Sequence, residues 1–309
     1  MTTKYGHQSS WQYAMEDTPE VPTSSVAFKL PGFITGETPI EPKFNLHEFR
    51  ALKQPSDTDM RAVDHVQPFK NEYAWSLSYV PLKRMGDTFP KYDFRHFHNM
   101  ALNATSSTVT NGAWTYGTSI TTNINTFTVF KEIDNIQYQV NGCRIGRLTG
   151  RCSVDNPVEI QCDGQGSAAS FANLAHTDAS SLRDGTPFMW GDVTVYIDGS
   201  LATFCTAYEY TVNNNAEASH VLGDLDPKAY RPKGRLIEGS ITRQFQDSAQ
   251  YAAAKAGTAK SITISLSDST GNALIGFRNC KYEEHPIPGA VDGLLTHVLK
   301  FRAETMFSR

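Results

Sequence analysis

The most constraining feature of this sequence is a two-residue alternation of apolar and polar side chains that recurs along most of its 309 residues. This period is typical of half-buried β-strands, because successive side chains of a strand point to opposite faces of a sheet. Clusters of Gly, Asn, Asp and Pro interrupt the alternation and predict turns. Strands are predicted within residues 44–50, 72–80, 127–133, 136–162, 192–212, 234–245, 261–280 and 294–304.

Helix is predicted in only two segments. Residues 247–257 contain Asp247 as a candidate N-cap, then an Ala-rich run, and end at Gly257, which can close a helix. Residues 93–104 have Asp93 as a candidate cap and apolar side chains near helical spacing. Those side chains are Phe94, Phe97, Met100 and Ala101. The fold class predicted from these patterns is mainly β.

The two halves of the chain repeat one order of predicted elements. In each half, a strand is followed by an irregular stretch, a second strand and a helix. The irregular stretches, 51–71 and 213–233, have equal length. Turn dipeptides at Asn141–Gly142 and Asp198–Gly199 lie in similar local contexts, although such dipeptides are common in β proteins. This order suggests a tandem duplication.

The duplication would divide the chain into two β domains. The first is predicted at residues 1–165, including an N-terminal arm, and the second at residues 186–309. A linker at 166–185 would join them, because this stretch is rich in small and polar residues and has little apolar periodicity.

The charge balance excludes a strongly basic nucleic-acid reader. Charged residues make up 19% of the chain and the formal net charge is −4. The first twenty residues hold no apolar run of the kind found in export signals, and no later segment is long and apolar enough for a membrane span. We therefore expect synthesis and folding in the cytosol, with no membrane partner.

The chemistry-bearing residues do not form a recognisable site. An odd number of cysteines without a C-x-x-C pair predicts reduced thiols rather than disulfides or a zinc site. These are Cys143, Cys152, Cys162, Cys205 and Cys280. His96 and His98 are the nearest approach to a ligand pair, but i,i+2 spacing on the predicted helix directs them about 200° apart.

Catalytic motifs are also missing from the sequence. It contains no G-x-S-x-G, H-E-x-x-H or P-loop motif, and no G-x-G-x-x-G that opens a helix. We therefore expect no enzyme activity, no metal and no cofactor. A glycosidase-like pair of carboxylates stays open as an alternative, because two carboxylates need only meet in space.

The order of these patterns resembles the tail tube proteins of tailed phages and related viruses. The resemblance begins at "YGHQSSWQYAMEDTPEVP" and continues through the strands and glycine turn of residues 126–166. It is strongest in residues 192–257, where a short turn, a strand, a long loop, a strand and a helix follow in the family's order. The hairpin and last strand of residues 261–304 complete it.

The resemblance implies a β-sandwich or flattened barrel with one packed helix, and a structural rather than catalytic role. Subunits of this family join sheets into rings, and the rings stack into a hollow tube that conducts the genome into the host. Three chains per ring would suit a duplicated chain, in a pseudo-six-fold arrangement, and six chains would suit a single elaborated fold. The implied partners are copies of the chain and the tape-measure, terminator and baseplate or tip proteins, with viral DNA passing through without specific binding.

The two irregular stretches match the position of the family's loop between stacked rings. The resemblance therefore implies axial contacts by charged residues in both. The candidates are Asp57, Asp59, Arg61, Asp64, Asp224, Asp226, Lys228 and Arg231. Solvated surface loops are the plainer alternative.

A β-sandwich module of a tail tip that binds a receptor or carbohydrate is the competing function. Such a module is expected to cluster exposed aromatic residues, whereas the four Trp residues are scattered along the sequence.

Overall fold

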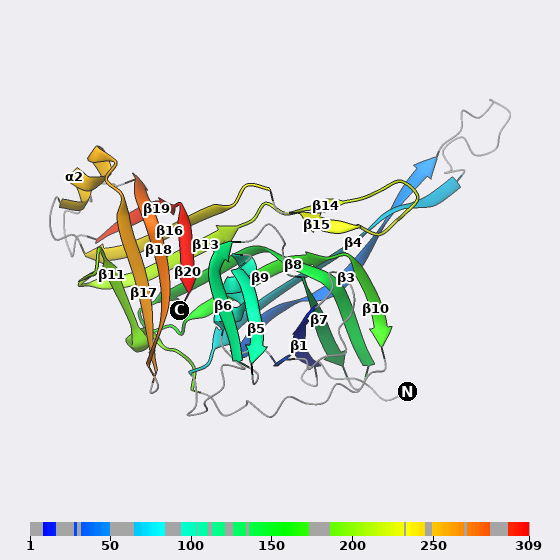
Figure 1. Cartoon of the computed structure of the whole chain (residues 1–309), viewed down its shortest axis with the longest axis horizontal. Helices are drawn as coiled ribbons and strands as arrows, with labels where there is room; N and C mark the ends of the chain where they lie inside the picture. The colour runs from blue at the N-terminus through cyan, green and yellow to red at the C-terminus, as the bar shows by residue number, and fades with distance from the viewer. Residues whose placement is uncertain are drawn as a thin grey trace.

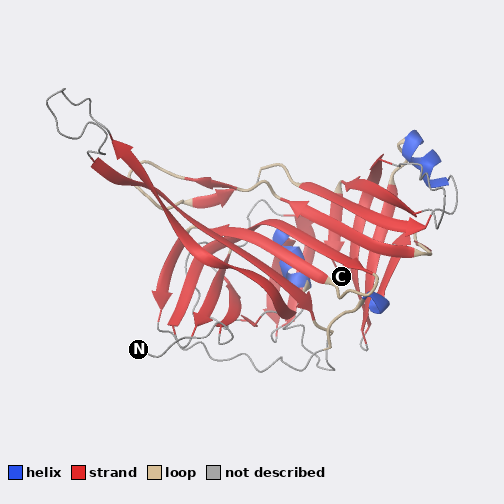
Figure 2. Cartoon of the chain, turned by 180° about the vertical axis from the view of Figure 1, so that it is seen from behind, coloured by secondary structure: helices blue, strands red, loops and turns tan. Residues whose placement is uncertain are grey.

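The computed structural model describes residues 9–16, 28–29, 32–49, 65–83, 94–102, 104–110, 113–120, 126–133, 136–172, 186–231, 233–244, 249–268, 271–284 and 296–308. Most of these residues lie in strands, and Figure 2 shows how few are helical. The prediction of a mainly β fold is therefore confirmed.

Strands from the first part of the chain occupy one end of the molecule in Figure 1. They are β1 (Ser9–Met15), β2 (Phe28–Lys29), β3 (Gly32–Phe49), β4 (His65–Pro81), β7 (Phe127–Ile133), β8 (Ile136–Ser153), β9 (Glu159–Gly166) and β10 (Ala168–Ala172). A separate pair is formed by β5 (Ala104–Thr110) and β6 (Ala113–Ile120).

Strands from the second part of the chain occupy the other end. They are β11 (Val193–Ile197), β12 (Ser200–Leu201), β13 (Cys205–Asn213), β16 (Leu236–Gln244), β17 (Lys260–Asp268), β18 (Gly271–Glu284), β19 (Thr296–Ala303) and β20 (Thr305–Ser308). A separate pair is formed by β14 (Glu217–Ser219) and β15 (Ala229–Arg231). The helical elements are α1 (Arg95–Ala101), η2 (Trp190–Asp192) and α2 (Ala249–Ala256).

Strand β8 joins both parts of the chain into one 16-stranded antiparallel sheet. Its first residues pair with β7 and β10, and its later residues pair with β9 and β13. From β13 the sheet continues through β16, β19, β18 and β17 to β11 and β12, and from β9 it continues through β4 to β3. The sheet does not close: β3, β2 and β12 each pair with a single strand among the described residues.

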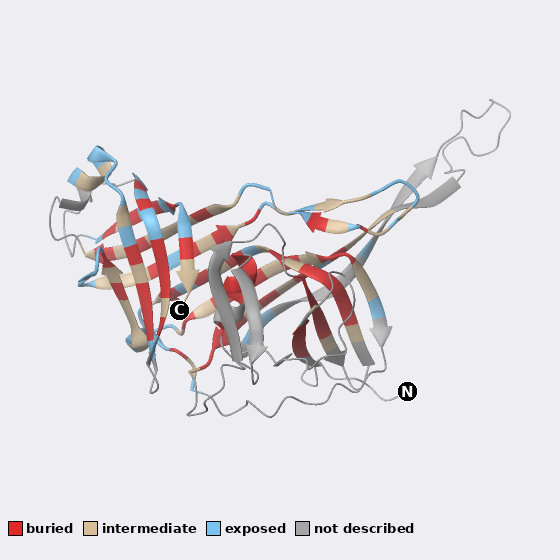
Figure 3. Ribbon diagram, viewed as in Figure 1, coloured by how far each residue is buried: buried red, intermediate tan, exposed pale blue. Residues whose placement is uncertain are grey.

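The two faces of the central strands differ sharply in burial. Buried residues alternate with partly buried ones along β9 and with partly buried or exposed ones along β19, as a period of two requires. On the buried face, the rings of Tyr210 and Phe301 lie where a Cβ at Gly150 or Gly239 would stand. Glycine at these positions therefore leaves room for large aromatic side chains beside the backbone. Figure 3 shows that buried residues are common along these strands.

Helix α1 packs on this buried face because its apolar side chains share one side. Phe97 and Met100 are buried, as the helical spacing predicts. Asn214 donates hydrogen bonds from Nδ2 to the carbonyl oxygens of Ala101 (2.8 Å) and Ile145 (2.9 Å), so it ties the end of α1 to β8. His98 is also buried, with Nε2 2.5 Å from the Tyr210 hydroxyl, which makes it part of the core rather than a ligand.

Several local predictions are confirmed. Helix α2 lies within 247–257, and Gly257 follows it with φ +62° and donates its N–H to the Ala254 carbonyl (3.1 Å). Strands β17 and β18 form the hairpin predicted in residues 261–280. The candidate caps Asp93 and Asp247 lie outside the described residues.

The Asn141–Gly142 dipeptide was expected to be a turn, and that expectation is wrong. It lies inside β8, where Gly142 adopts φ +63° and the register with β7 shifts. The dipeptide therefore makes a bulge in a continuous strand. By contrast, Asp198 and Gly199 both have positive φ and connect β11 to β12 as a tight turn.

The predicted linker contains ordered sheet. β9 extends to Gly166, and β10 then pairs with β8, while residues 173–185 lie outside the described residues. The division into domains 1–165 and 186–309, and the duplication itself, stay predictions.

Candidate assembly surface

A long hairpin of β3 and β4 projects from the sheet. Its register runs from Gly32 opposite Pro81 to Phe49 opposite His65. Residues 73–79 of β4 also pair with β9, whereas 65–72 pair only with β3 among the described strands. The anchored part alternates buried and exposed side chains, and the outer part extends past the sheet (Figures 1 and 2). This arrangement corrects the expectation of an irregular stretch over residues 65–71.

The β14–β15 hairpin, with its turn at residues 220–228, forms a second projection that we call the arm. It runs in the same direction as the long hairpin (Figure 1). Irregular structure was expected throughout 213–233, but Glu217 pairs with Arg231 and Ser219 with Ala229. Strands this short carry too weak an alternation to be distinguished from a loop by pattern alone.

Asp226 joins the arm to the long hairpin. Its Oδ1 accepts hydrogen bonds from Asn71 Nδ2 (2.7 Å) and from the Tyr73 hydroxyl (2.6 Å). The Asn71 backbone N–H also donates to the Leu225 carbonyl (2.9 Å). Hydrogen bonds to a charged acceptor are stronger than those between neutral groups, so this contact fixes the direction of the arm.

Two tyrosines at the base of the arm are held in their neutral form. Burial, followed by the hydrogen bond to Asp226, raises the pKa of Tyr73 well above its usual value. Burial, followed by the nearby charges of Glu72 and Glu217, raises the pKa of Tyr230 to about 12. The Tyr230 carbonyl also accepts a hydrogen bond from the Arg144 guanidinium on β8. The base of the arm is therefore a packed joint.

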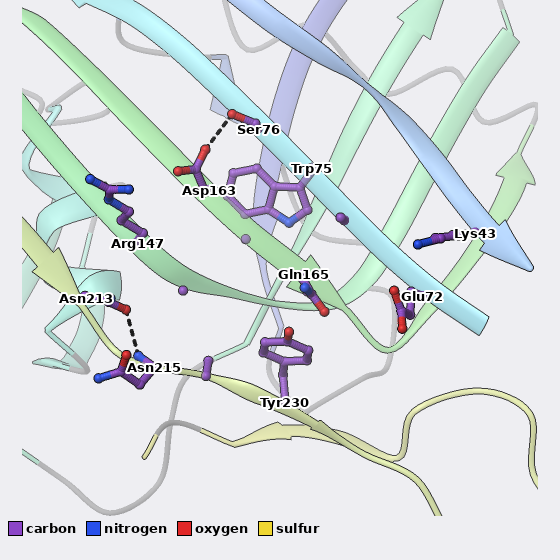
Figure 4. Close-up of a pocket in the computed structure, with 14 residues that line it drawn as sticks. Lys43, Glu72, Trp75, Ser76, Arg147, Asp163, Gln165, Asn213, Asn215 and Tyr230 are labelled. Carbon is purple, nitrogen blue, oxygen red and sulfur yellow. Dashed lines mark hydrogen bonds between the residues drawn. The ribbon is translucent and has the colours of Figure 1, made fainter. Parts of the chain in front are cut away.

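A cleft of about 710 Å³ opens between this joint and the sheet (Figure 4). Trp75, Asp163 and Arg147 line it from β4, β9 and β8, and Tyr230 lines it from the arm. Ser76 donates to Asp163 Oδ1 (2.5 Å) across neighbouring strands. No group of three or more His, Cys, Asp or Glu residues is positioned to hold a metal ion in the part of the chain that the structure describes.

The profile of the phage tail tube protein family matches residues 8–303. That range takes in both projections and all but the last of the described strands. The chain belongs to the phage tail tube protein family. A search of curated proteins finds no match to it.

Membership of the tail tube family makes this chain a structural protein of the virion tail. The family resemblance read from the sequence is thus confirmed over nearly the whole chain. Among the residues that the structure describes, no helix has the length and apolar character needed to cross a bilayer.

The structure places half of the predicted axial-contact residues of this tail tube protein. Asp224 forms an ion pair with Lys228 within the arm (2.6 Å), and Arg231 lies exposed on β15. Asp226 contacts the long hairpin of its own chain. Asp57, Asp59, Arg61 and Asp64 lie outside the described residues.

Sequence reasoning missed the most conspicuous part of the arm, which is its apolar turn. Leu222 is 104% exposed, and Val221 and Leu225 are exposed beside it. The only signal in the sequence is a short "VLGDL" run inside a polar loop. Such a run resembles an ordinary loop in the sequence. Only the structure shows that its apolar side chains are exposed.

Proposed function

We propose that copies of this chain join into rings, that the rings stack into a hollow tube, and that the tube conducts the viral genome into the host. The observation that carries this proposal is the open sheet, whose margins at β3, β2 and β12 have one partner each among the described strands. Unpaired strand edges recruit further strands, and a second copy can supply them. A contact between two different surfaces of identical chains generates rings or filaments.

The hairpin and the arm are suited to the contacts between rings. They project together from one end of the sheet and are joined at Asp226. We assign Asp224, Lys228 and Arg231, with the candidates at 57, 59, 61 and 64, to these axial contacts. Asp226 would support them by holding the arm in place.

A polar sheet face would suit a channel for DNA. Thr149, Thr211, Glu238 and Arg302 lie in one cross-strand row of β8, β13, β16 and β19. The Arg302 guanidinium is 3.0 Å from Glu238 and 2.9 Å from Glu283. A cation already paired with carboxylates gains little from a phosphate, so DNA could slide past without being retained.

The further partners follow from the family. We propose that the chain is made in the host cytoplasm and meets the tape-measure, terminator and baseplate or tip proteins during tail assembly. Rings of three chains, if each half of the chain is one tube unit, or of six chains both suit this function.

Negative-stain microscopy of the purified full chain tests the proposal. Rings or hollow rods are expected, and a chain that stays a compact monomer at every concentration would contradict it. Deletion of residues 55–68 tests the axial contacts separately. Shorter tubes or unstacked rings are expected, whereas unchanged tube length and yield would remove the long hairpin from this role.

A further inference from the structure

Exposed large apolar side chains gather in two places on this molecule. The described chain has nine of them, and eight fall into two clusters; the ninth is Ile34. The first cluster is the turn of the arm, with Val221, Leu222 and Leu225. The second cluster lies around β12 and consists of Val154, Met189, Trp190, Leu201 and Phe204.

The second cluster surrounds an uncharged cleft of about 490 Å³, which we call the β12 cleft. Apolar side chains of Trp190, Leu201 and Phe204 line it, together with threonines and small residues. No Asp, Glu, Lys or Arg is among its lining residues. Such a cleft accepts an apolar side chain without leaving a charge unpaired.

The backbone at the mouth of the β12 cleft is strained. Phe204 has φ +56°, a conformation that is costly for a bulky residue, and its side chain is 61% exposed. Strain of this kind persists only where the surrounding structure holds the residue in that conformation. Here it keeps an aromatic ring at the rim of the cleft, where a partner would meet it.

The two clusters cannot meet within one chain. The arm projects at one end of the long axis, whereas β11 and its partner β12 lie at the other end, as both views show (Figures 1 and 2). The turn of the arm is drawn as exposed in Figure 3. Within the described part of the chain the turn of the arm does not reach the β12 cleft, so a second molecule is needed to bring this turn to it.

We propose that the arm turn, with Leu222 at its centre, docks in the β12 cleft of a second copy of this chain. Each copy then donates one turn and receives one, which is a heterologous contact that can repeat along a tube. The inference rests on the proposed function, and it names the surface that receives the arm. The exposed side chains at the centre of the turn are apolar, and the nearby charge of Asp224 is already paired with Lys228 of the same turn. The lining of the cleft is uncharged, so a charged peptide would find no group of opposite charge there.

The first test compares two substitutions at Leu222. Leu222→Asp brings a carboxylate to an apolar cleft and is expected to reduce sedimentable tubes by about tenfold or more, as at an interface hot spot. Leu222→Met keeps an apolar side chain of similar size and is expected to assemble as the parent chain does. Normal tube yield with Leu222→Asp would overturn the inference but leave the tube function standing.

The second test is a cross-link, which does not depend on a loss of assembly. Leu222→Cys and Phe204→Cys are combined in a chain that also carries Cys152→Ser and Cys205→Ser, because both native cysteines line the cleft. Mild oxidation should then give a ladder of disulfide-linked oligomers on a non-reducing gel. Leu222→Cys combined with Lys255→Cys on α2 is the matched control and should give none.

The possible outcomes separate the two proposals. A ladder from the Leu222 and Phe204 pair alone supports docking. Tubes without a ladder, or equal ladders from both pairs, overturn docking while the tube function stands. If the parent chain forms neither rings nor tubes and gives no ladder, the proposed function and the docking inference both fail.

Discussion

At the scale of single residues, the core depends on glycines that give aromatic rings room. Gly150 on β8 faces Tyr210 of β13, and a Cβ there would overlap the tyrosine ring. Gly146 on the same strand is different, because a Cβ there would lie 3.6 Å from the Asp163 carbonyl, an ordinary contact. The two positions therefore make a matched pair for testing how tightly the sheet is packed.

Gly150→Ala is expected to destabilise the chain by about 1–3 kcal/mol, the usual cost of overpacking a dense core. Tyr210 also contacts His98, so it has little freedom to move aside. Gly146→Ala should change stability by less than about 0.5 kcal/mol. Denaturant unfolding measures both, and equal effects of the two substitutions would contradict this account.

Buried thiols make stability depend on alkaline pH. Burial raises the pKa of Cys152 and of Cys205 to about 11 each from an ordinary value near 9. Between these values the unfolded chain loses protons that the folded chain keeps, so rising pH favours unfolding. The stabilisation is complete below pH 9 and is lost as pH rises through 11.

The melting temperature should therefore fall between pH 9 and 11, by about 2–4 °C for each kcal/mol lost. Thermal unfolding monitored by circular dichroism measures the fall. Cys205→Ser should make the fall shallower, because serine does not titrate in this range. An identical slope in the parent and Cys205→Ser chains would rule out a contribution from this thiol.

At the scale of elements, one carboxylate supplies both side-chain hydrogen bonds that join the turn of the arm to Asn71 and Tyr73 of the long hairpin. Asp226→Ala removes both side-chain hydrogen bonds from Asn71 and Tyr73. Because hydrogen bonds to charged groups contribute about 1.5–3 kcal/mol, hydrogen exchange in 217–231 should become about tenfold faster or more. Asp224→Ala removes an ion pair with Lys228 and a hydrogen bond from the Asp226 backbone N–H, both within the arm, and serves as the control because it leaves the contacts to the long hairpin in place. Equal exchange in the two variants would show that Asp226 does not anchor the arm.

Elements with strong local patterns could be predicted from sequence. β7 matches the predicted strand at 127–133, and α2 ends at Gly257 as its composition indicates. Features that depend on pairing with strands distant in the sequence could not be predicted. Asn141–Gly142 became a bulge because β7 and β10 both pair with β8 at that point, and no local signal reports such partners. The apolar turn at Leu222 was missed because its unusual feature is the exposure of its side chains, which the sequence pattern does not report.

At the scale of the whole molecule, the pairing of strand β8 with β13 joins the two predicted domains into one sheet. β8 belongs to the first predicted domain but pairs with β13 of the second over Arg147–Ser153. A chain cut between them would leave a long strand edge unpaired on each side.

Residues 1–165 and 186–309 expressed separately are therefore expected to aggregate or to remain unfolded. Their co-expression should restore a soluble complex. Solubility and circular dichroism of each piece test this expectation. A stable, monomeric fold of either piece alone would instead support independent domains.

The polar sheet face carries a prediction about DNA. Glu238→Gln with Glu283→Gln removes both carboxylates beside Arg302. The freed guanidinium of Arg302 should then bind a phosphate of the DNA. Each such contact should steepen the fall of DNA affinity of assembled tubes with salt, by about one released counterion. Filter binding at varied salt measures the change. Ser240→Ala, on a neighbouring row of the same face, should leave the salt dependence unchanged.

The pairing of β1 with β7 has a consequence for synthesis on the ribosome. β1 can pair early with the short strand β2, but Met15 lies opposite Phe127, so about 110 residues must be added before β1 can pair with its long partner β7. At ordinary elongation rates this takes roughly 5–20 s. Trp11 and Tyr13, which end up buried, remain uncovered by β7 throughout that interval. The yield of folded protein should therefore respond to translation speed.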